Sequence, residues 1–136
     1  MSIIDREELL QRVLLAVLSV ERVEDGPLVA PVWYEYRPTG QFLLLVPSWS
    51  PKAALMRRWG RASLCVYQDG EPQRYVSATG SVEVRELDEA ECYAAMLSMA
   101  VRYEGHERGT EAAGRLAQDP VSLVTLTPHR WHAQVF

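Results

Sequence analysis

The clearest chemical signal in the sequence is a group of serines and cations that follows an apolar strand pattern. In this segment Ser50 can serve as an N-cap and Pro51 as the first residue of a short helix. The N–H groups of a first helical turn have no intrahelical partners, so such a helix end attracts phosphate. Hydroxyl groups and fixed cations nearby would add charge-assisted hydrogen bonds. The candidate anion-binding residues are Ser48, Ser50, Lys52, Arg57 and Arg58.

The charge distribution singles out the same segment. The 136 residues include 14 Lys and Arg against 18 Asp and Glu, which gives a formal net charge of −4. A general positive field for nucleic acid or an anionic membrane is therefore not expected, and any affinity for phosphate must be local. Between Glu35 and Asp69 there is no acidic residue at all. Helix capping and the helix dipole would explain the serines and arginines equally well, so spacing alone does not decide between a ligand and a purely structural role.

Aromatic residues close to this segment would suit a flat heteroaromatic ligand. Trp33 and Tyr34 fall on a predicted strand, and Trp49 stands between the two serines in a predicted loop. Core packing is the more frequent explanation for aromatic residues on strands. Trp49 is the hardest of the three to explain by packing alone.

Other kinds of catalytic site are not indicated. His129 and His132 have no third ligand nearby and no zinc-like spacing, so no metal is expected. Cys65 lies in an apolar strand pattern, where a free cysteine usually behaves as a small hydrophobic residue. The acidic pairs fall at predicted caps or turns, which does not favour hydrolysis. Neither a GxGxxG nor a GxxxxGK[ST] motif occurs, so neither a Rossmann nor a P-loop site is expected.

The composition predicts one compact domain over residues 1–136. Hydrophobic residues make up 48% of the chain, enough for a substantial core. Cys65 and Cys92 have no CxxC spacing, which favours reduced thiols. The N-terminus does not resemble a signal peptide, and no apolar stretch is long enough to span a bilayer. We therefore expect a cytoplasmic protein.

The elements expected to position these residues are mostly strands. Apolar alternation and turn signals predict strands at 13–22, 28–36, 41–46, 62–68, 74–85, 121–126 and 131–136. The first three are expected to form an antiparallel meander, and Pro128 to separate the last two. Gly80 indicates a bulge or a close backbone approach.

Helices are expected in four places. A capping box at Asp5 and Glu8 would begin the first helix, and Gly60 would end the helix at 50–59. A third helix, capped by residues 87–91, would run to about residue 103, and a weaker fourth would span 110–117. The predicted fold class is mainly β (α+β), a six- to seven-stranded antiparallel split β-barrel with short flanking helices.

Four segments resemble motifs of a known family. Residues 25–34 (DGPLVAPVWY) are similar to DGxPxxxPVWF, and residues 50–58 (SPKAALMRR) to SxKxxNLRR. Residues 61–66 (RASLCV) are similar to PRVSLxV, and residues 75–83 (YVSATGSVE) to YVxVxGxAxV. Together they resemble the pyridoxamine-phosphate-oxidase-like split β-barrels, in particular the oxidoreductases that depend on flavin or on the deazaflavin F420.

The resemblance implies a homodimer with F420 or FMN at the subunit interface and a small-molecule acceptor, where the cofactor performs the hydride chemistry. No acid or base then needs to be named. It implies that Lys52 binds phosphate, assisted by Ser50 and by Arg57 or Arg58, and that Pro31, Val32 and Trp33 contact the ring. The sequence does not distinguish FMN from F420. A non-catalytic carrier or sensor of flavin, F420 or haem is an alternative, and so is a barrel kept only for dimer-mediated interactions.

Overall fold

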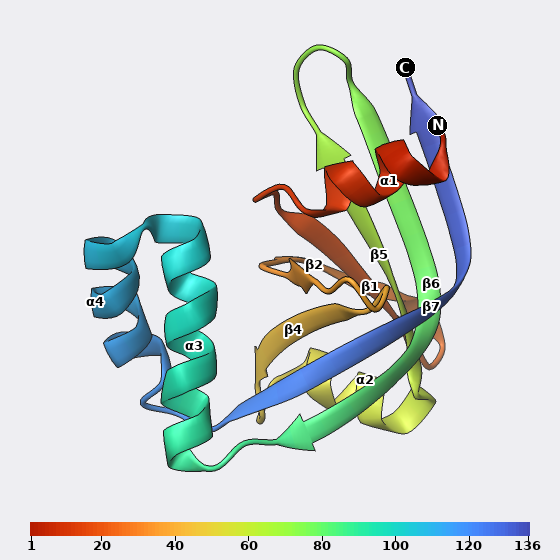
Figure 1. Ribbon diagram of the computed structural model, residues 1–136. Helices are drawn as coiled ribbons and strands as arrows, with labels where there is room; N and C mark the ends of the chain where they lie inside the picture. The colour runs from red at the N-terminus through yellow and green to blue at the C-terminus, as the bar shows by residue number, and fades with distance from the viewer.

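The computed structural model describes residues 1–136 as an open antiparallel barrel with a helical hairpin at one side (Figure 1). Seven strands form one sheet in the order β2-β1-β5-β6-β7-β4-β3. The strands are β1 (Ala16–Arg22), β2 (Asp25–Val32), β3 (Glu35–Tyr36), β4 (Phe42–Pro47), β5 (Arg61–Gln68), β6 (Arg74–Glu86) and β7 (Val121–Val135). The end strands β2 and β3 do not pair with each other, so the barrel is not closed. The predicted fold class, a mainly β split barrel, is confirmed.

The main core fills the inside of this barrel. Alternate side chains of the strands are fully buried there, among them Leu18, Leu44 and Val66. The helices α1 (Ile3–Leu10) and α2 (Pro51–Trp59) add Leu9 and Met56 to the same core. No helix combines the length and the apolar character that crossing a membrane requires.

The caps of α2 are as predicted, whereas the N-cap of α1 is not. In α2, Ser50 is the N-cap, Pro51 opens the helix and Gly60 ends it in the left-handed region at φ 64°, as predicted. In α1 the capping box is formed by Ser2 and Asp5, so this helix begins one turn before the predicted box at Asp5 and Glu8. Asp5 is its third residue and not its cap.

The predicted meander of three strands is confirmed only in part, because its middle strand, 28–36, is divided into β2 and β3. β2 pairs only with β1 at one edge of the sheet, whereas β3 pairs only with β4 at the other. The predicted strand 28–36 breaks at Trp33 and Tyr34 because side chains of a distant helix satisfy the backbone there. The Tyr34 N–H donates to Tyr103 Oη at 2.9 Å, and the Tyr34 carbonyl accepts from Arg102 Nε at 3.2 Å.

The two last predicted strands form one strand, β7, in which Pro128 does not interrupt the pairing. Gly80 pairs with Pro128 and Thr79 with Arg130, so a register shift between Thr79 and Gly80 accommodates the proline. A Cβ atom at Gly80 would lie 2.0 Å from the carbonyl oxygen of Thr127. The predicted bulge and close approach at Gly80 are therefore confirmed.

The hairpin consists of α3 (Glu89–Glu104) and α4 (His106–Leu116), which connect β6 to β7. The capping box of Asp88 and Glu91 begins α3 as predicted. The fourth helix starts four residues earlier than predicted, because Gly105, at φ 86°, separates two consecutive helices. Gly109 lets α4 approach α3 closely, since a Cβ there would lie 2.6 Å from Val101 Cα. A second, smaller core lies between the two helices and includes Met96.

Candidate functional site

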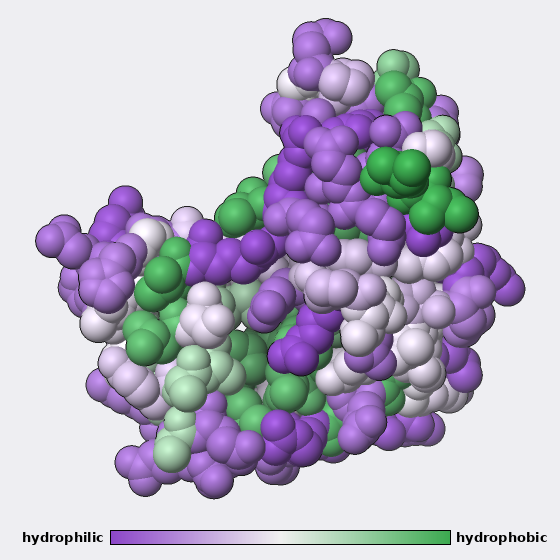
Figure 2. Space-filling model, in the orientation of Figure 1, coloured by the Kyte–Doolittle hydropathy of each residue, from purple (hydrophilic) through white to green (hydrophobic).

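A cavity of about 600 Å³ lies between the barrel and the helical hairpin. Figure 2 shows apolar surface in the recess between these two parts of the molecule. Most of the lining residues are apolar. The barrel side contributes the end of β2, the strand β4 and the turn that leads into α2, and the hairpin contributes residues of α3 and α4. A mainly apolar recess with a few charged groups is typical of a small-molecule site.

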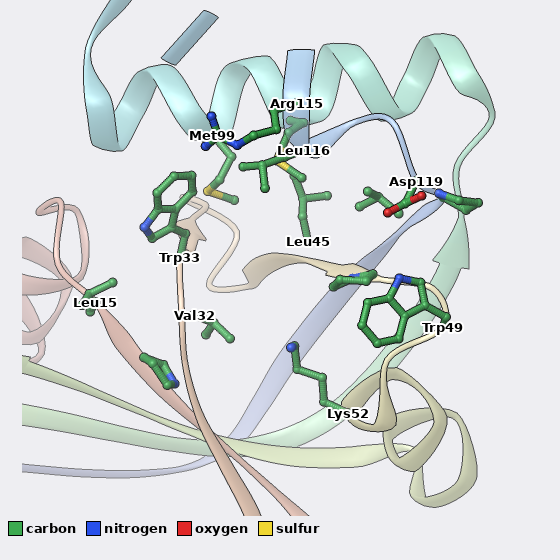
Figure 3. Close-up of a pocket in the computed structure, with 15 residues that line it drawn as sticks. Leu15, Val32, Trp33, Leu45, Trp49, Lys52, Met99, Arg115, Leu116 and Asp119 are labelled. Atoms are coloured by element: carbon green, nitrogen blue, oxygen red, sulfur yellow. The ribbon is translucent and has the colours of Figure 1, made fainter. Parts of the chain in front are cut away.

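Four of the predicted site residues line this cavity. Pro31, Val32 and Trp33, predicted to contact a ring, come from the end of β2, and Lys52, predicted to bind phosphate, comes from the first turn of α2. In Figure 3 the amino group of Lys52 points into the cavity. Lys52 forms no ion pair and no side-chain hydrogen bond. The structure therefore places the predicted ring wall and the predicted phosphate cation at one site.

Trp33 is held in place by α3. Its ring stacks on Tyr103, with ring centroids 4.9 Å apart and an interplanar angle of 7°. The Tyr103 hydroxyl donates to the Leu14 carbonyl at 2.6 Å and accepts from the Tyr34 N–H at 2.9 Å. Burial raises the pKa of Tyr103, so this phenol stays protonated and remains a donor. The orientation of the ring wall therefore depends on the hairpin.

Ser48 and Arg57 belong to a polar network beside the cavity. The Ser48 hydroxyl donates to Glu86 Oε2 at 2.8 Å, and Arg57 forms an ion pair with Glu86. Arg57 also donates to Ser122 Oγ at 3.0 Å and to the Ser48 carbonyl at 3.2 Å. Neither Ser48 nor Arg57 lines the cavity. The network ties the turn before α2 to the ends of β6 and β7.

Ser50 and Arg58, the other two predicted anion-binding residues, do not line the cavity either. Ser50 is 2% exposed, and its hydroxyl donates to the Pro47 carbonyl and accepts from the Ala53 N–H. Arg58 places its guanidinium 5.2 Å from the ring centroid of Trp59. In the structure these residues cap and flank the helix that carries Lys52.

The cavity contains three charged side chains without a partner. Lys52, Arg115 and Asp119 line it, and none of them forms an ion pair or a side-chain hydrogen bond. Figure 3 shows Lys52 and Arg115 on opposite walls. Two cations against one carboxylate leave the site with an excess of positive charge, which favours anionic ligands.

Comparison with known proteins identifies solved structures that share the fold of this barrel. No protein-family model matches the chain, and no curated protein matches it in sequence. Solved structures do match: the conserved hypothetical protein Rv2991 from Mycobacterium tuberculosis has a TM-score of 0.79 at 21% identity, covering 99% of this chain and 85% of that one. An F420 reductase has a TM-score of 0.73 at 18% identity, covering 93% of this chain and 94% of that one.

The fold is that of the pyridoxamine-phosphate-oxidase-like split β-barrels. Among the split barrels that match is also HutZ, the haem storage protein from Vibrio cholerae, with a TM-score of 0.69 at 16% identity over 98% of this chain and 93% of that one. Split barrels therefore include proteins with different ligands. At these identities the likeness establishes the fold, and the ligand of this chain has to be argued from its own cavity.

The hairpin side of this split-barrel cavity is not evident from the sequence. Met96, Met99, Arg115 and Leu116 line it. The three-residue spacing of Met96 and Met99 predicts that they share one helix face, but such a face usually packs in a core. Trp49, which the sequence did single out, lines the cavity and is 72% exposed.

The Glu86 network predicts a pH-dependent contribution to stability in this split barrel. Hydrogen bonds from Ser122 and Ser48, together with the nearby Arg57, lower the pKa of Glu86 below its ordinary value of 4.5. Ionised Glu86 therefore stabilises the fold above that ordinary value, and this contribution is lost as the pH falls through the lower pKa of the folded state. We expect Glu86→Gln to destabilise the protein at neutral pH and to cost less at an acidic pH well below 4.5.

Urea unfolding of wild type and Glu86→Gln at both pH values checks this prediction. Glu83→Gln is a matched control, because Glu83 is on the same strand and its side chain forms no hydrogen bond or ion pair. A Glu86→Gln cost that is equal at both pH values would contradict the role given to the ionised carboxylate.

Proposed function

We propose that the chain is an oxidoreductase that transfers a hydride between F420 or FMN and a small organic acceptor. The main support for this proposal is that Lys52 lines the same largely apolar cavity as Pro31, Val32 and Trp33. A cofactor with a planar ring and a phosphate needs an apolar wall and a nearby cation, and both are present. When bound, such a cofactor supplies the hydride chemistry itself.

The chain's own residues would bind and orient the cofactor. Lys52 has a free ammonium group in the first turn of α2, where the helix dipole also favours phosphate. Val32 is buried and Trp33 is fixed by its stack on Tyr103, so the wall presented to the ring is rigid. Rigid positioning of a flat ring is what hydride transfer requires of the protein.

We further propose that each chain folds as one domain and that two copies form a homodimer. This dimer would be the active form, in the cytoplasm. The outer face of β1 and β2 exposes Val17 and Val29, and Val17 pairs with Pro31, which also lines the cavity. Covering this apolar face with a second copy would bring that copy close to the cofactor site. The free cysteines, Cys65 and Cys92, suit a reducing compartment.

Titration of the purified protein with F420 and FMN tests the proposed cofactor. We expect at least one of them to bind more tightly than about 100 μM, and Lys52→Ala to weaken that binding by about tenfold or more. Fluorescence quenching or an absorbance change measures both values. Arg37→Ala removes the same charge from an exposed turn outside the cavity and serves as the control. The proposal fails if neither cofactor binds, and the role of Lys52 fails if both variants bind as wild type.

A non-catalytic carrier of flavin, F420 or haem is the second candidate. One observation favours binding of flavin or F420 without turnover: no hydroxyl and no imidazole group lines the cavity, so proton donors are few, and a haem would lack an imidazole ligand. Steady-state assays with reduced cofactor and a panel of acceptors separate the two functions. Tight binding without reduction of any acceptor would identify a carrier.

A further inference from the structure

The wall of the cavity opposite Lys52 suggests what the acceptor is. Given the proposed function, we propose that Arg115 binds the carboxylate of the acceptor, and that the acceptor class is therefore an apolar organic acid. This assigns the barrel side of the cavity to the cofactor and the hairpin side to the second ligand.

Arg115 is available for such a ligand. It lies in the last turn of α4, lines the cavity, and forms no hydrogen bond or ion pair with its side chain. Arg85, by contrast, already has a partner within the protein, because it forms an ion pair with Glu91. A guanidinium group offers paired donors in a plane, which match the two oxygens of a carboxylate.

The residues around Arg115 suit an apolar ligand body. Met96 and Met99 are buried residues of α3 that line the cavity, and Leu116 is 41% exposed. Methionine side chains adapt to irregular apolar shapes, and Leu116 would lose contact with water when covered by a ligand. An apolar molecule with one anionic group therefore satisfies both features of this wall.

The charges in the cavity also determine how that molecule is oriented. Lys52 stands on the opposite wall and is assigned to the cofactor phosphate, which leaves Arg115 as the cation for a second anion. Asp119 lies apart from Arg115, on the side of the cavity where Trp49 is drawn (Figure 3). Since Asp119 repels a carboxylate, the anionic end is directed toward Arg115 and the apolar body toward the remaining wall.

Binding of 1-naphthoate and of its neutral counterpart 1-naphthamide tests the inference. Calorimetric titration would use protein saturated with whichever of F420 and FMN binds. We expect naphthoate to bind about tenfold more tightly than naphthamide, Arg115→Gln to abolish this preference, and Arg115→Lys to keep part of it. Arg108→Gln is the matched control, because Arg108 is on the same helix, 81% exposed, and does not line the cavity.

The outcomes separate this inference from the proposed function. If the cofactor binds but Arg115→Gln keeps the preference for naphthoate, or wild type shows none, the inference is overturned and the proposed function stands. If Arg115→Gln weakens cofactor binding as strongly as Lys52→Ala, Arg115 belongs to the cofactor site and the inference is again overturned. If neither cofactor binds, the proposed function fails and the acceptor assignment fails with it, even where naphthoate still binds through Arg115.

Discussion

Replacing Gly80 by alanine is expected to lower the free energy of unfolding by about 3 kcal/mol, the upper part of the range for overpacked sites. The new Cβ would lie 2.0 Å from the carbonyl oxygen of Thr127 and 2.7 Å from Pro128 Cα. Both are backbone atoms of the paired strand β7, so no side chain can rotate away to make room. The two strands would have to separate at the bulge, which disturbs their hydrogen bonds.

Urea unfolding at one fixed protein concentration measures this loss, since any dimerisation makes stability depend on concentration. Gly26→Ala is the matched control, because a Cβ at Gly26 meets nothing within 4 Å. Equal unfolding midpoints for the two variants would show that the strands part at little cost, contrary to the prediction.

Replacing Tyr103 by phenylalanine is expected to cost about 2 kcal/mol, the penalty for leaving partly buried polar groups unpaired. The hydroxyl bridges the Tyr34 N–H and the Leu14 carbonyl, at 2.9 and 2.6 Å. Phenylalanine keeps the aromatic stack on Trp33 and removes only this bridge. The loss of stability in this variant therefore measures how much the Tyr103 bridge contributes to holding the hairpin against the break between β2 and β3.

Denaturant unfolding, together with hydrogen exchange at the Tyr34 amide, checks this prediction. Protection of that amide should fall in Tyr103→Phe. Tyr93→Phe is the control on the same helix, because Tyr93 is 44% exposed and its hydroxyl forms no hydrogen bond. Unchanged protection at Tyr34 in Tyr103→Phe would mean that another group or water satisfies the amide.

Much of the fold was predictable because local rules decide it. The caps of α2 at Ser50 and Gly60 depend on residues close together in the sequence, and both predictions were confirmed. The bulge at Gly80 was also confirmed, because the glycine itself signals a close approach although Thr127 and Pro128 are distant in the sequence. Alternation of apolar residues also indicated where most strands lie. It says which face of a strand is buried, but not where a strand is interrupted, and so the middle strand of the predicted meander proved to be two strands.

The remaining errors have long-range causes. The strand predicted at 28–36 breaks because Tyr103, 69 positions away from Tyr34, pairs with its backbone. Pro128 continues a strand because Gly80 on the partner strand leaves room for it. The candidate site was predictable on the barrel side, where Lys52 and Trp33 stood in motifs. Arg115 was not, since a basic residue at a helix end is ordinary in sequence.

The helical hairpin leaves and re-enters the sheet through a single pair of neighbouring residues, Glu86 and Ser122, which face each other on β6 and β7. The segment between these two residues, which includes α3 and α4, is an insertion between the two strands of one long β-hairpin. The length of that insertion can therefore change without shifting the register of β6 against β7, whereas Arg102 and Tyr103 must stay, because they satisfy the backbone at Tyr34. A lineage or a protein engineer can vary the cavity-facing residues of α3 and α4 while these contacts keep the barrel wall in place.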